Sequence, residues 1–318
     1  MPASAVLLLA LLGISFAGPL VRLSNADPLA IAIWRLGFSL IVIAIALLIT
    51  GSWRQWQRLD RRAALIAFGA GAMLAIHFWS WNASVSMTTV AASVLLVNAQ
   101  PAIVALLSVV WLHEPPNRRQ WAGIIIAMLG AAVVALPELH DSSGAHATRA
   151  LLGDALAFLG AITGATYFVA GRRLRETLDL WPYVGIVYGA CFLVLLGFAA
   201  ATHAPVSPQP PRELLIFVAL ALGPMLLGHT GFNWALKYMP AYVVNLTLLG
   251  EPVGATLLAA LLPGIRELPS AATFLGGALI LVGVYVAARA ARRSAQDPAS
   301  ANPIGSDVVE TFRSQQAD

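Results

Sequence analysis

The segment "LTLLGEPVGATLLAALL" (residues 246–262) is apolar from end to end except for one carboxylate, Glu251, which Pro252 follows directly. With the apolar residues before it, the run from 241 to 262 is long enough to cross a bilayer core of about 30 Å as a helix. A chargeable group near the middle of such a helix is costly and usually functional. The segment therefore predicts a membrane-spanning helix with a chemically active carboxyl group near its centre.

Composition indicates the same class for the whole chain. Of 318 residues, 59% are hydrophobic and only 11% are charged, and the mean hydropathy is +0.78. Soluble domains contain about 25% charged residues. Long apolar runs recur, and we expect an all-α membrane protein with ten transmembrane helices, at 4–21, 29–49, 63–81, 90–112, 119–137, 151–170, 181–201, 212–235, 241–262 and 270–289.

Several classes of protein are disfavoured by what the sequence holds. The single cysteine, Cys191, lies in an apolar run and offers neither a disulfide framework nor a thiolate metal site. The basic residues are scattered rather than clustered with aromatic residues, so we expect no nucleic-acid partner. We find no phosphate loop, nucleotide turn or catalytic triad, and therefore predict no enzyme activity, no cofactor, no metal and no ATP-driven pump.

The basic residues predict the topology. If the amino terminus is cytoplasmic, thirteen Lys and Arg residues fall on the cytoplasmic side and four on the outer side. Short cytoplasmic loops carry the excess of Lys and Arg. This bias requires the first apolar run to remain as a span, and that run lacks the basic leader of a signal peptide. We expect a multi-pass protein of a bacterial inner membrane with both termini in the cytoplasm.

The two halves of the chain align with each other. At a shift of 151 residues, and of 153 after the last outer loop, polar residues and glycines coincide. The aligned pairs are Asn82 with Asn233, Gln100 with Glu251, Pro101 with Pro252, Gly13 with Gly164, Glu114 with Glu267, Gly123 with Gly276, and Gly130 with Gly283. We predict a first five-helix repeat at 1–138, a second at 150–290, and a disordered cytoplasmic tail at 291–318.

Five spans per repeat is an odd number, so the second repeat enters the membrane from the opposite side. Inverted repeats are a common architecture of secondary transporters, with the solute site at the repeat interface near the midplane. The alternative is a duplication that serves stable packing only. We favour the transporter.

Glu251 and Gln100 lie at the same depth in mirror-related helices. A buried carboxyl group can stay protonated, exchange a proton with a cavity, or bind a cation. Pro252 and Pro101 should kink their helices and free the carbonyls of Leu248 and Val97. The alternative is a protonated Glu251 that bonds a neighbouring helix and locks the fold.

Other polar residues are weaker candidates. His77 and His229 lie in corresponding helices near Trp81 and Asn233, and Asn98 and Asn245 lie near the two central prolines. Trp is common at membrane interfaces, and buried Asn often makes a plain interhelical hydrogen bond. For Arg35, two turns into its helix, we consider three roles: outward snorkelling, which we favour, binding of a substrate carboxylate, or pairing with Asp154. Spacings such as Gly160/Gly164 and Gly185/Gly189 predict close helix contacts.

Three stretches carry a resemblance to a known family. They are "GDALAFLGAITGATYFVAGRRL" (153–174), "VNAQPAIVALLSVVWLHEPPNRRQWAGIIIAMLGAAVV" (97–134) and "RELPSAATFLGGALILVGVY" (266–285). Together with the Glu251 segment, they resemble the EamA-like family of the drug/metabolite transporter superfamily. The resemblance covers about 4–290 and implies a ten-helix carrier, in most members an exporter of amino acids, metabolites or drugs.

The resemblance adds Tyr167 to the candidates and supports Arg35 and Glu251. We therefore expect a secondary transporter that exports a small organic solute by alternating access, with the proton as candidate coupling ion at Glu251. An uncoupled facilitator, or a membrane-embedded protein without transport activity, is the alternative. The predicted substrate-binding residues are Glu251, Gln100, Asn98, His77, Trp81, Tyr167, His229, Asn233, Asn245 and Arg35, with helix kinks at Pro101 and Pro252. The expected partners are the solute, protons and the lipid bilayer.

Overall fold

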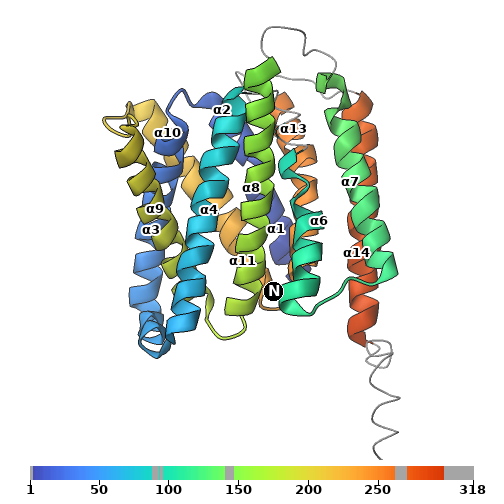
Figure 1. Ribbon diagram of the computed structural model, residues 1–318, viewed down its shortest axis with the longest axis horizontal. Helices are drawn as coiled ribbons and strands as arrows, with labels where there is room; N and C mark the ends of the chain where they lie inside the picture. The colour runs from blue at the N-terminus through green and yellow to red at the C-terminus, as the bar shows by residue number, and fades with distance from the viewer. Residues whose placement is uncertain (1–2, 88–92, 94–95, 140–146, 262–270, 297–318) are drawn as a thin grey trace, which may run out of the picture.

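The computed structural model describes residues 3–87, 93, 96–139, 147–261 and 271–296, and all regular structure in these ranges is helical (Figure 1). Within these ranges, six helices are long and apolar enough to cross a membrane: Ala3–Leu23, Pro28–Thr50, Arg61–Val85, Leu151–Leu174, Leu180–Thr202 and Pro211–Ala235. Two shorter apolar helices are Gln100–Leu112 and Phe274–Ala287. The predicted all-helical membrane class is confirmed. A total of ten spans remains a prediction.

The first half of the chain contains eight described helical elements. They are α1 (Ala3–Ser15), α2 (Ala17–Leu23), α3 (Pro28–Thr50), η1 (Ser52–Arg58), α4 (Arg61–Met87), α6 (Gln100–Leu107), η2 (Ser108–Leu112) and α7 (Arg118–Leu139). The second half contains α8 (Ala147–Leu174), α9 (Leu180–Thr202), α10 (Pro211–Leu220), η3 (Ala221–His229), α11 (Thr230–Ala235), α12 (Ala241–Thr247), η4 (Leu248–Gly250), α13 (Glu251–Leu261) and α14 (Ala271–Gln296).

Local sequence signals set the helix ends. Asp27 caps α3, because its Oδ1 accepts a hydrogen bond from the Leu29 backbone N–H at 2.8 Å, and Pro28 occupies the first helical turn. Gly51 ends the same helix in the left-handed conformation, with φ of 63°. The last helix, α14, continues to Gln296, so residues 291–296 of the predicted tail are helical. The remainder of the tail, 297–318, lies outside the described residues.

In the second half of the chain, two described segments interrupt regular α-helix. In the segment from α10 to α11, Pro224 lies inside the π-helical element η3. In the segment from α12 to α13, the 3₁₀ element η4 directly precedes Glu251. Non-α geometry of this kind is frequent at functional sites. Both interruptions lie on segments that carry predicted site residues, His229 and Glu251.

The helices pack in a recurring pattern of neighbours (Figure 1). Helix α4 contacts α8 and α9, and α3 also contacts α9. Helix α1 contacts η3, α11 and α13, whereas α6 contacts α8 and α12. Helices α7 and α14 run side by side at one edge of the bundle and form the most extensive helix pair.

Glycines allow the α7–α14 pair to approach closely. A Cβ atom on Gly123 would lie 2.6 Å from the Gly283 carbonyl oxygen, and one on Gly130 would lie 2.6 Å from the Gly276 carbonyl oxygen. Small residues at such crossings let backbones touch and maximise van der Waals contact in lipid. The contact predicted at Gly189 is wrong, because a Cβ there would meet nothing within 4 Å.

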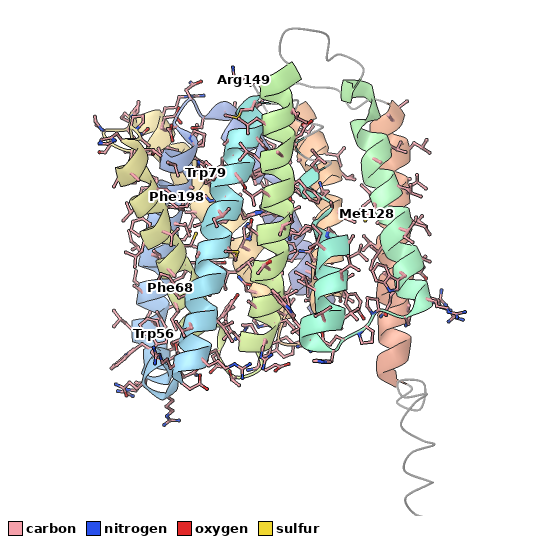
Figure 2. The ribbon with its side chains drawn as sticks, viewed as in Figure 1. Trp56, Phe68, Trp79, Met128, Arg149 and Phe198 are labelled. Atoms are coloured by element: carbon pink, nitrogen blue, oxygen red, sulfur yellow. The ribbon has the colours of Figure 1, made fainter. Side chains whose placement is uncertain are left out.

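Polar contacts tie distant segments together at both ends of the bundle. At the end that carries η1, Arg172 forms an ion pair of 2.7 Å with Glu114 and donates to the Leu236 carbonyl at 2.8 Å. At the end that carries Arg149 (Figure 2), Glu213 accepts hydrogen bonds from the Ser24 hydroxyl at 2.5 Å and the Asn25 N–H at 3.3 Å. Each set joins segments from both halves of the chain.

We expect Gly130→Ala to lower the free energy of unfolding by about 1–3 kcal/mol, because the added methyl group overlaps the α14 backbone. Thermal unfolding in detergent measures the change. Gly189→Ala is the matched control, and it should leave stability unchanged or raise it by up to about 1 kcal/mol through better helix propensity. Equal effects of the two substitutions would show that the α7–α14 crossing does not depend on bare glycine.

Candidate functional site

Arg35 of α3 is buried in the middle of the bundle, with 2% of its surface exposed. Its guanidinium carbon lies 3.5 Å from the centre of the Phe78 ring on α4. The Nε and Nη2 atoms have no hydrogen-bond partner among the described residues. The snorkelling role that we favoured is therefore wrong, because the side chain is covered by protein and stacks on an aromatic ring instead of reaching the interface.

Phe78 joins Arg35 to two of the predicted histidines. Its ring contacts His229 edge to face, at 5.3 Å between centroids and 84° between planes, and it contacts His77 at 5.4 Å. The Nδ1 atom of His229 has no hydrogen-bond partner among the described residues. Helices α3 and α4 and the π-helical element η3 therefore meet around one aromatic ring.

Glu251 begins α13 and is half-buried. Its carboxyl group lies within electrostatic range of Arg35, but the described contacts include no ion pair or hydrogen bond between the two side chains. The free carbonyl predicted at Leu248 is wrong, because the Glu251 N–H donates to it across the 3₁₀ turn. Pro252 is the second residue of α13, and Pro101 is likewise the second residue of α6. In both cases the interruption of regular α-helix comes directly before the proline pair.

His77 and Gln100 converge on a glycine of α8. A Cβ atom on Gly164 would lie 2.5 Å from Gln100 Oε1 and 2.8 Å from His77 Nδ1. His77 Nδ1 also lies 2.8 Å from the Gly160 carbonyl oxygen, within hydrogen-bond distance. The absence of side chains at these two glycines lets two polar groups from α4 and α6 occupy the surface of α8.

The sequence symmetry between Gln100 and Glu251 does not extend to their contacts. Gly13 aligns with Gly164, yet a Cβ on Gly13 would meet the backbone of Gly223 and Gly228, both at 2.9 Å. At Gly164 the surface of α8 contacts polar side chains, whereas at the aligned Gly13 the surface of α1 contacts the backbone of η3. Glu251 instead lies in range of Arg35.

Tyr167 of α8 and Asn233 of α11 form a second polar group. The Asn233 side-chain amide donates to the Tyr167 hydroxyl at 2.5 Å and to the Tyr188 hydroxyl at 3.1 Å. Tyr188 also contacts the Thr230 hydroxyl at 3.2 Å, and Arg175 donates to the Asn233 carbonyl at 3.1 Å. This buried network ties α8, α9 and α11 together.

Three predicted site residues lie outside these two groups. Trp81 packs in a separate apolar cluster with Ile31 and Phe217, and its Nε1 has no partner among the described residues. Asn245 is fully buried, and neither of its side-chain polar atoms has a described partner. Asn98 is half-buried in the turn before α6. Buried polar groups without partners, such as those of Trp81 and Asn245, are rare in folded proteins.

Sequence reasoning missed Phe78, Tyr188 and Thr230. Phe78 follows His77 in an apolar run, where a ring alone does not reveal a cation on a facing helix. Tyr188 and Thr230 lie within apolar runs that look like ordinary spans. Their hydrogen bonds depend on which helices become neighbours, which no short motif specifies.

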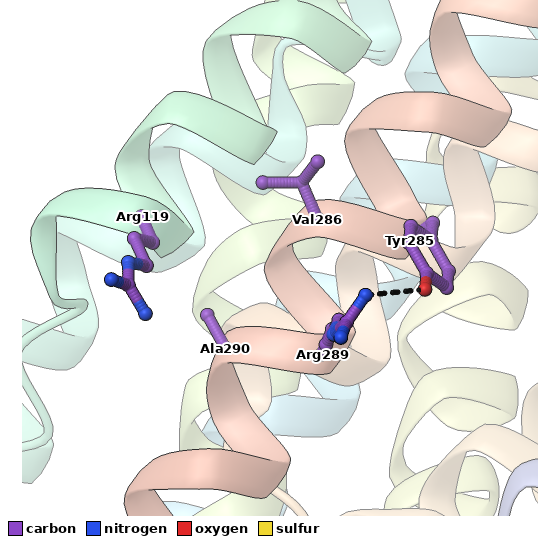
Figure 3. A pocket seen from close by; sticks show the side chains of 5 residues that line it. All are labelled: Arg119, Tyr285, Val286, Arg289 and Ala290. Atoms are coloured by element: carbon purple, nitrogen blue, oxygen red, sulfur yellow. Dashed lines mark hydrogen bonds between the residues drawn. The ribbon is translucent and has the colours of Figure 1, made fainter.

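A hollow of about 330 Å³ lies elsewhere, between the start of α7 and the last turns of α14 (Figure 3). Arg119 faces it from α7, and Tyr285, Val286, Arg289 and Ala290 line it from α14. Arg289 donates to the Tyr285 hydroxyl at 2.9 Å. None of the predicted site residues contributes to this hollow.

The EamA-like transporter family model matches residues 1–136 and again residues 151–289. The chain belongs to the EamA-like transporter family. The two matches together cover nearly all of residues 1–289. This EamA-like protein is therefore a multi-pass membrane protein of a transporter family.

Known relatives cover most of this EamA-like chain. It is 24% identical over 297 residues to "Inner membrane protein YtfF" of Escherichia coli, covering 87% of this chain and 91% of that protein. It is 26% identical over 284 residues to an "Uncharacterized transporter" of Archaeoglobus fulgidus, covering 87% and 94%. A solved crystal structure shares the fold, with a TM-score of 0.76 at 20% identity over 92% of this chain and 98% of that one.

We expect Asn233→Leu to destabilise the EamA-like protein by about 1–3 kcal/mol, because the Tyr167 hydroxyl loses its donor inside the bundle. Tyr167→Phe alone should cost about 1 kcal/mol. In the Asn233→Leu background, Tyr167→Phe should be neutral or stabilising, since it removes a buried unpaired hydroxyl. Thermal unfolding of the four proteins gives the coupling energy, and strictly additive effects would refute the network.

Proposed function

We propose that this EamA-like protein is a secondary carrier of the bacterial inner membrane that exports a small organic solute by alternating access and exchanges a proton at Glu251. The observation that carries the proposal is that a buried cation, Arg35, stacked on Phe78, lies within electrostatic range of a half-buried acid, Glu251. Charged groups inside a membrane protein line substrate or ion pathways. Export rests on the family resemblance alone.

The pattern of helix neighbours supports an inverted repeat. Under the alignment of the halves, the α4–α8 contact corresponds to the contact of α1 with η3 and α11, and α6–α8 corresponds to α13–α1. In the pairs α3–α9 and α7–α14, the alignment exchanges the two helices of the pair, so each contact is mapped onto itself. Gly123 against Gly283 and Gly130 against Gly276 are likewise exchanged by the alignment. The family model also matches each half separately. Two similar halves packed in this way can adopt two related arrangements, one open to each side.

The polar contacts at the two ends are the proposed gates. The Glu114–Arg172 ion pair links the segment before α7 to the end of α8, and Arg172 also bonds the Leu236 carbonyl after α11. The Glu213 cluster links α10 to the segment between α2 and α3. Alternating access requires each set to break while the other holds. By the positive-inside rule, we assign the Glu114 end and both termini to the cytoplasm.

Glu251 is the proposed coupling group because it alone, in the mirror pair with Gln100, can gain and lose a proton. Its half-buried position leaves part of its surface accessible, and Arg35 supplies the charge that compensates its ionised form. Protonation of Glu251 would leave Arg35 uncompensated. A proton and the solute can thus influence each other through one buried cation.

In proteoliposomes loaded with a pH-sensitive dye, we expect pools of amino acids, organic acids or amines to produce solute-dependent proton movement with the wild-type protein. Glu251→Gln should abolish this proton signal, because the amide cannot exchange a proton. The exposed acid Glu176 provides the matched control, and Glu176→Gln should leave the signal unchanged.

A correctly folded Glu251→Gln protein that keeps full proton movement would refute the coupling role. Solute flux in the wild type without any proton movement would favour an uncoupled facilitator. A wild-type protein that moves none of the pooled solutes, while its thermal unfolding remains cooperative, would count against the carrier itself.

The single cysteine, Cys191, provides a reporter for opening. It is fully buried on α9 and lies in electrostatic range of Arg35. We expect Glu114→Gln to speed labelling of Cys191 by a small maleimide, because loss of the ion pair with Arg172 favours the state open at that end. The labelling rate is measured by mass shift in inside-out and right-side-out vesicles.

The control for the labelling experiment is a second ion pair at the same end. Asp179 pairs with Lys237 at 3.2 Å and is largely exposed. Its hydrogen bonds from Gln55 and Lys237 lower the pKa of the carboxyl group, but exposed pairs contribute little to stability. Asp179→Asn should therefore leave the labelling rate unchanged. Equal rates for the Glu114 and Asp179 variants would remove the proposed gate.

A further inference from the structure

Arg35 lacks the partner that a buried guanidinium normally has. With 2% exposure it is almost completely removed from water, and its Nε and Nη2 atoms make no hydrogen bond among the described residues. Arginine remains protonated in proteins. Buried N–H groups of a cation that make no hydrogen bond are costly, so the hydrogen bonding of Arg35 is incomplete among the described residues.

The packing of Phe78 determines which part of Arg35 can receive a partner. The guanidinium carbon is 3.5 Å from the ring centre, so the ring covers one face of the guanidinium. The N–H groups lie in the plane of the guanidinium and point past the ring edge. Their fork matches the two oxygens of a carboxylate, which accepts two parallel hydrogen bonds.

The ionisable groups around Arg35 do not supply that carboxylate. Those in electrostatic range are Glu251 on α13, His77 on α4, His229 on η3, and Tyr188 and Cys191 on α9. Only Glu251 is an acid, and it forms no described ion pair with Arg35. The two histidines add no negative charge. The arrangement leaves the hydrogen-bonding edge of Arg35 for an anion from outside the chain.

We propose that the transported solute carries a carboxylate group that binds the hydrogen-bonding edge of Arg35, with Phe78 holding the guanidinium in place. The inference rests on the proposed function, because it takes the central cluster as the solute site.

The charge of the solute determines what happens at Glu251, which compensates Arg35 when Glu251 is ionised. A monocarboxylate therefore binds with uptake of a proton by Glu251, which keeps the site neutral. A zwitterion can pair its ammonium group with ionised Glu251 and needs no proton, so a zwitterionic solute would keep the carrier but remove its proton coupling at Glu251.

The test is binding in detergent, which does not require transport. The probes are straight-chain carboxylates from acetate to octanoate with their amides, and leucine with leucinamide. At least one carboxylate probe should raise the melting temperature of the wild-type protein, and its amide should not. Arg35→Gln should lose this response, whereas Arg58→Gln, which removes an exposed arginine of η1, should keep it. Arg35→Lys keeps the charge but loses the fork, and should bind about tenfold more weakly.

Isothermal titration in two buffers of different ionisation enthalpy then separates the two kinds of carboxylate. Above the pH at which Glu251 loses its proton, binding of a monocarboxylate should take up a proton in the wild type and none in Glu251→Gln. Leucine should bind the wild type without proton uptake and should bind Glu251→Gln more weakly. Either pattern supports the carboxylate site and identifies the charge that the solute presents to Glu251.

Three results would overturn the inference. They are amides that stabilise the protein as well as the acids do, a carboxylate response that survives in Arg35→Gln, and the absence of any response to the whole carboxylate series. If Arg35→Gln does not fold, two other results together would also overturn the inference. They are an undiminished affinity of Arg35→Lys for the carboxylate, and a proton uptake on carboxylate binding that is unchanged in Glu251→Gln.

The inference and the carrier proposal fail separately. Solute-dependent proton movement in vesicles, combined with equal binding of acids and amides, would leave the carrier intact and remove the carboxylate site. Binding of carboxylates through Arg35, combined with no flux of any solute, would leave the anion site intact and remove the carrier.

Discussion

The cost of a guanidinium inside a membrane-spanning bundle is the constraint on which the central arrangement depends. Arg35 is removed from water and cannot discharge by losing its proton, so its surroundings must compensate it. Phe78 supplies the electron-rich face of its ring, and Glu251 supplies a carboxyl group within electrostatic range. These two residues come from α4 and α13, so a single cation fixes how three helices face one another.

Glycine positions decide how closely the remaining helices approach this centre. Gly160 and Gly164 leave the surface of α8 open, and the side chains of His77 and Gln100 fill it. Along the α7–α14 crossing the glycines are used differently, because the backbone at Gly123 and Gly130 meets the backbone of the partner helix. In lipid, helix association depends on close packing and interhelical hydrogen bonds rather than on hydrophobic burial. The same residue type therefore builds an apolar seam in one place and a polar recess in another.

The sequence predicts the features that depend on the composition of a single helix, such as its position and its unusual polar residues. It does not predict which helices contact one another. Hydropathy located most ends of the described helices closely, although α4 and α14 continue to Met87 and Gln296, beyond the spans predicted at 63–81 and 270–289. The unusual polar residues Glu251 and Gln100 were visible without a structure. The direction of Arg35 was not, because snorkelling and burial differ only in which neighbour covers the side chain. Tyr188 shows the same limit, since its partner Asn233 is on another helix. The Leu248 carbonyl was mispredicted because a 3₁₀ turn provided an alternative donor.

In the proposed repeat, the shared positions account for packing and the differing positions account for chemistry. Gly123 and Gly276, or Gly130 and Gly283, are equivalent and make equivalent contacts. By contrast, Gln100 and Glu251 differ in charge, and Gly164 and Gly13 differ in what covers them. A strictly symmetric carrier would place two equal acids at the midplane, each requiring its own compensating cation. One acid and one amide require only Arg35, so the departure from symmetry leaves one ionisable carboxyl group to couple to a single buried cation.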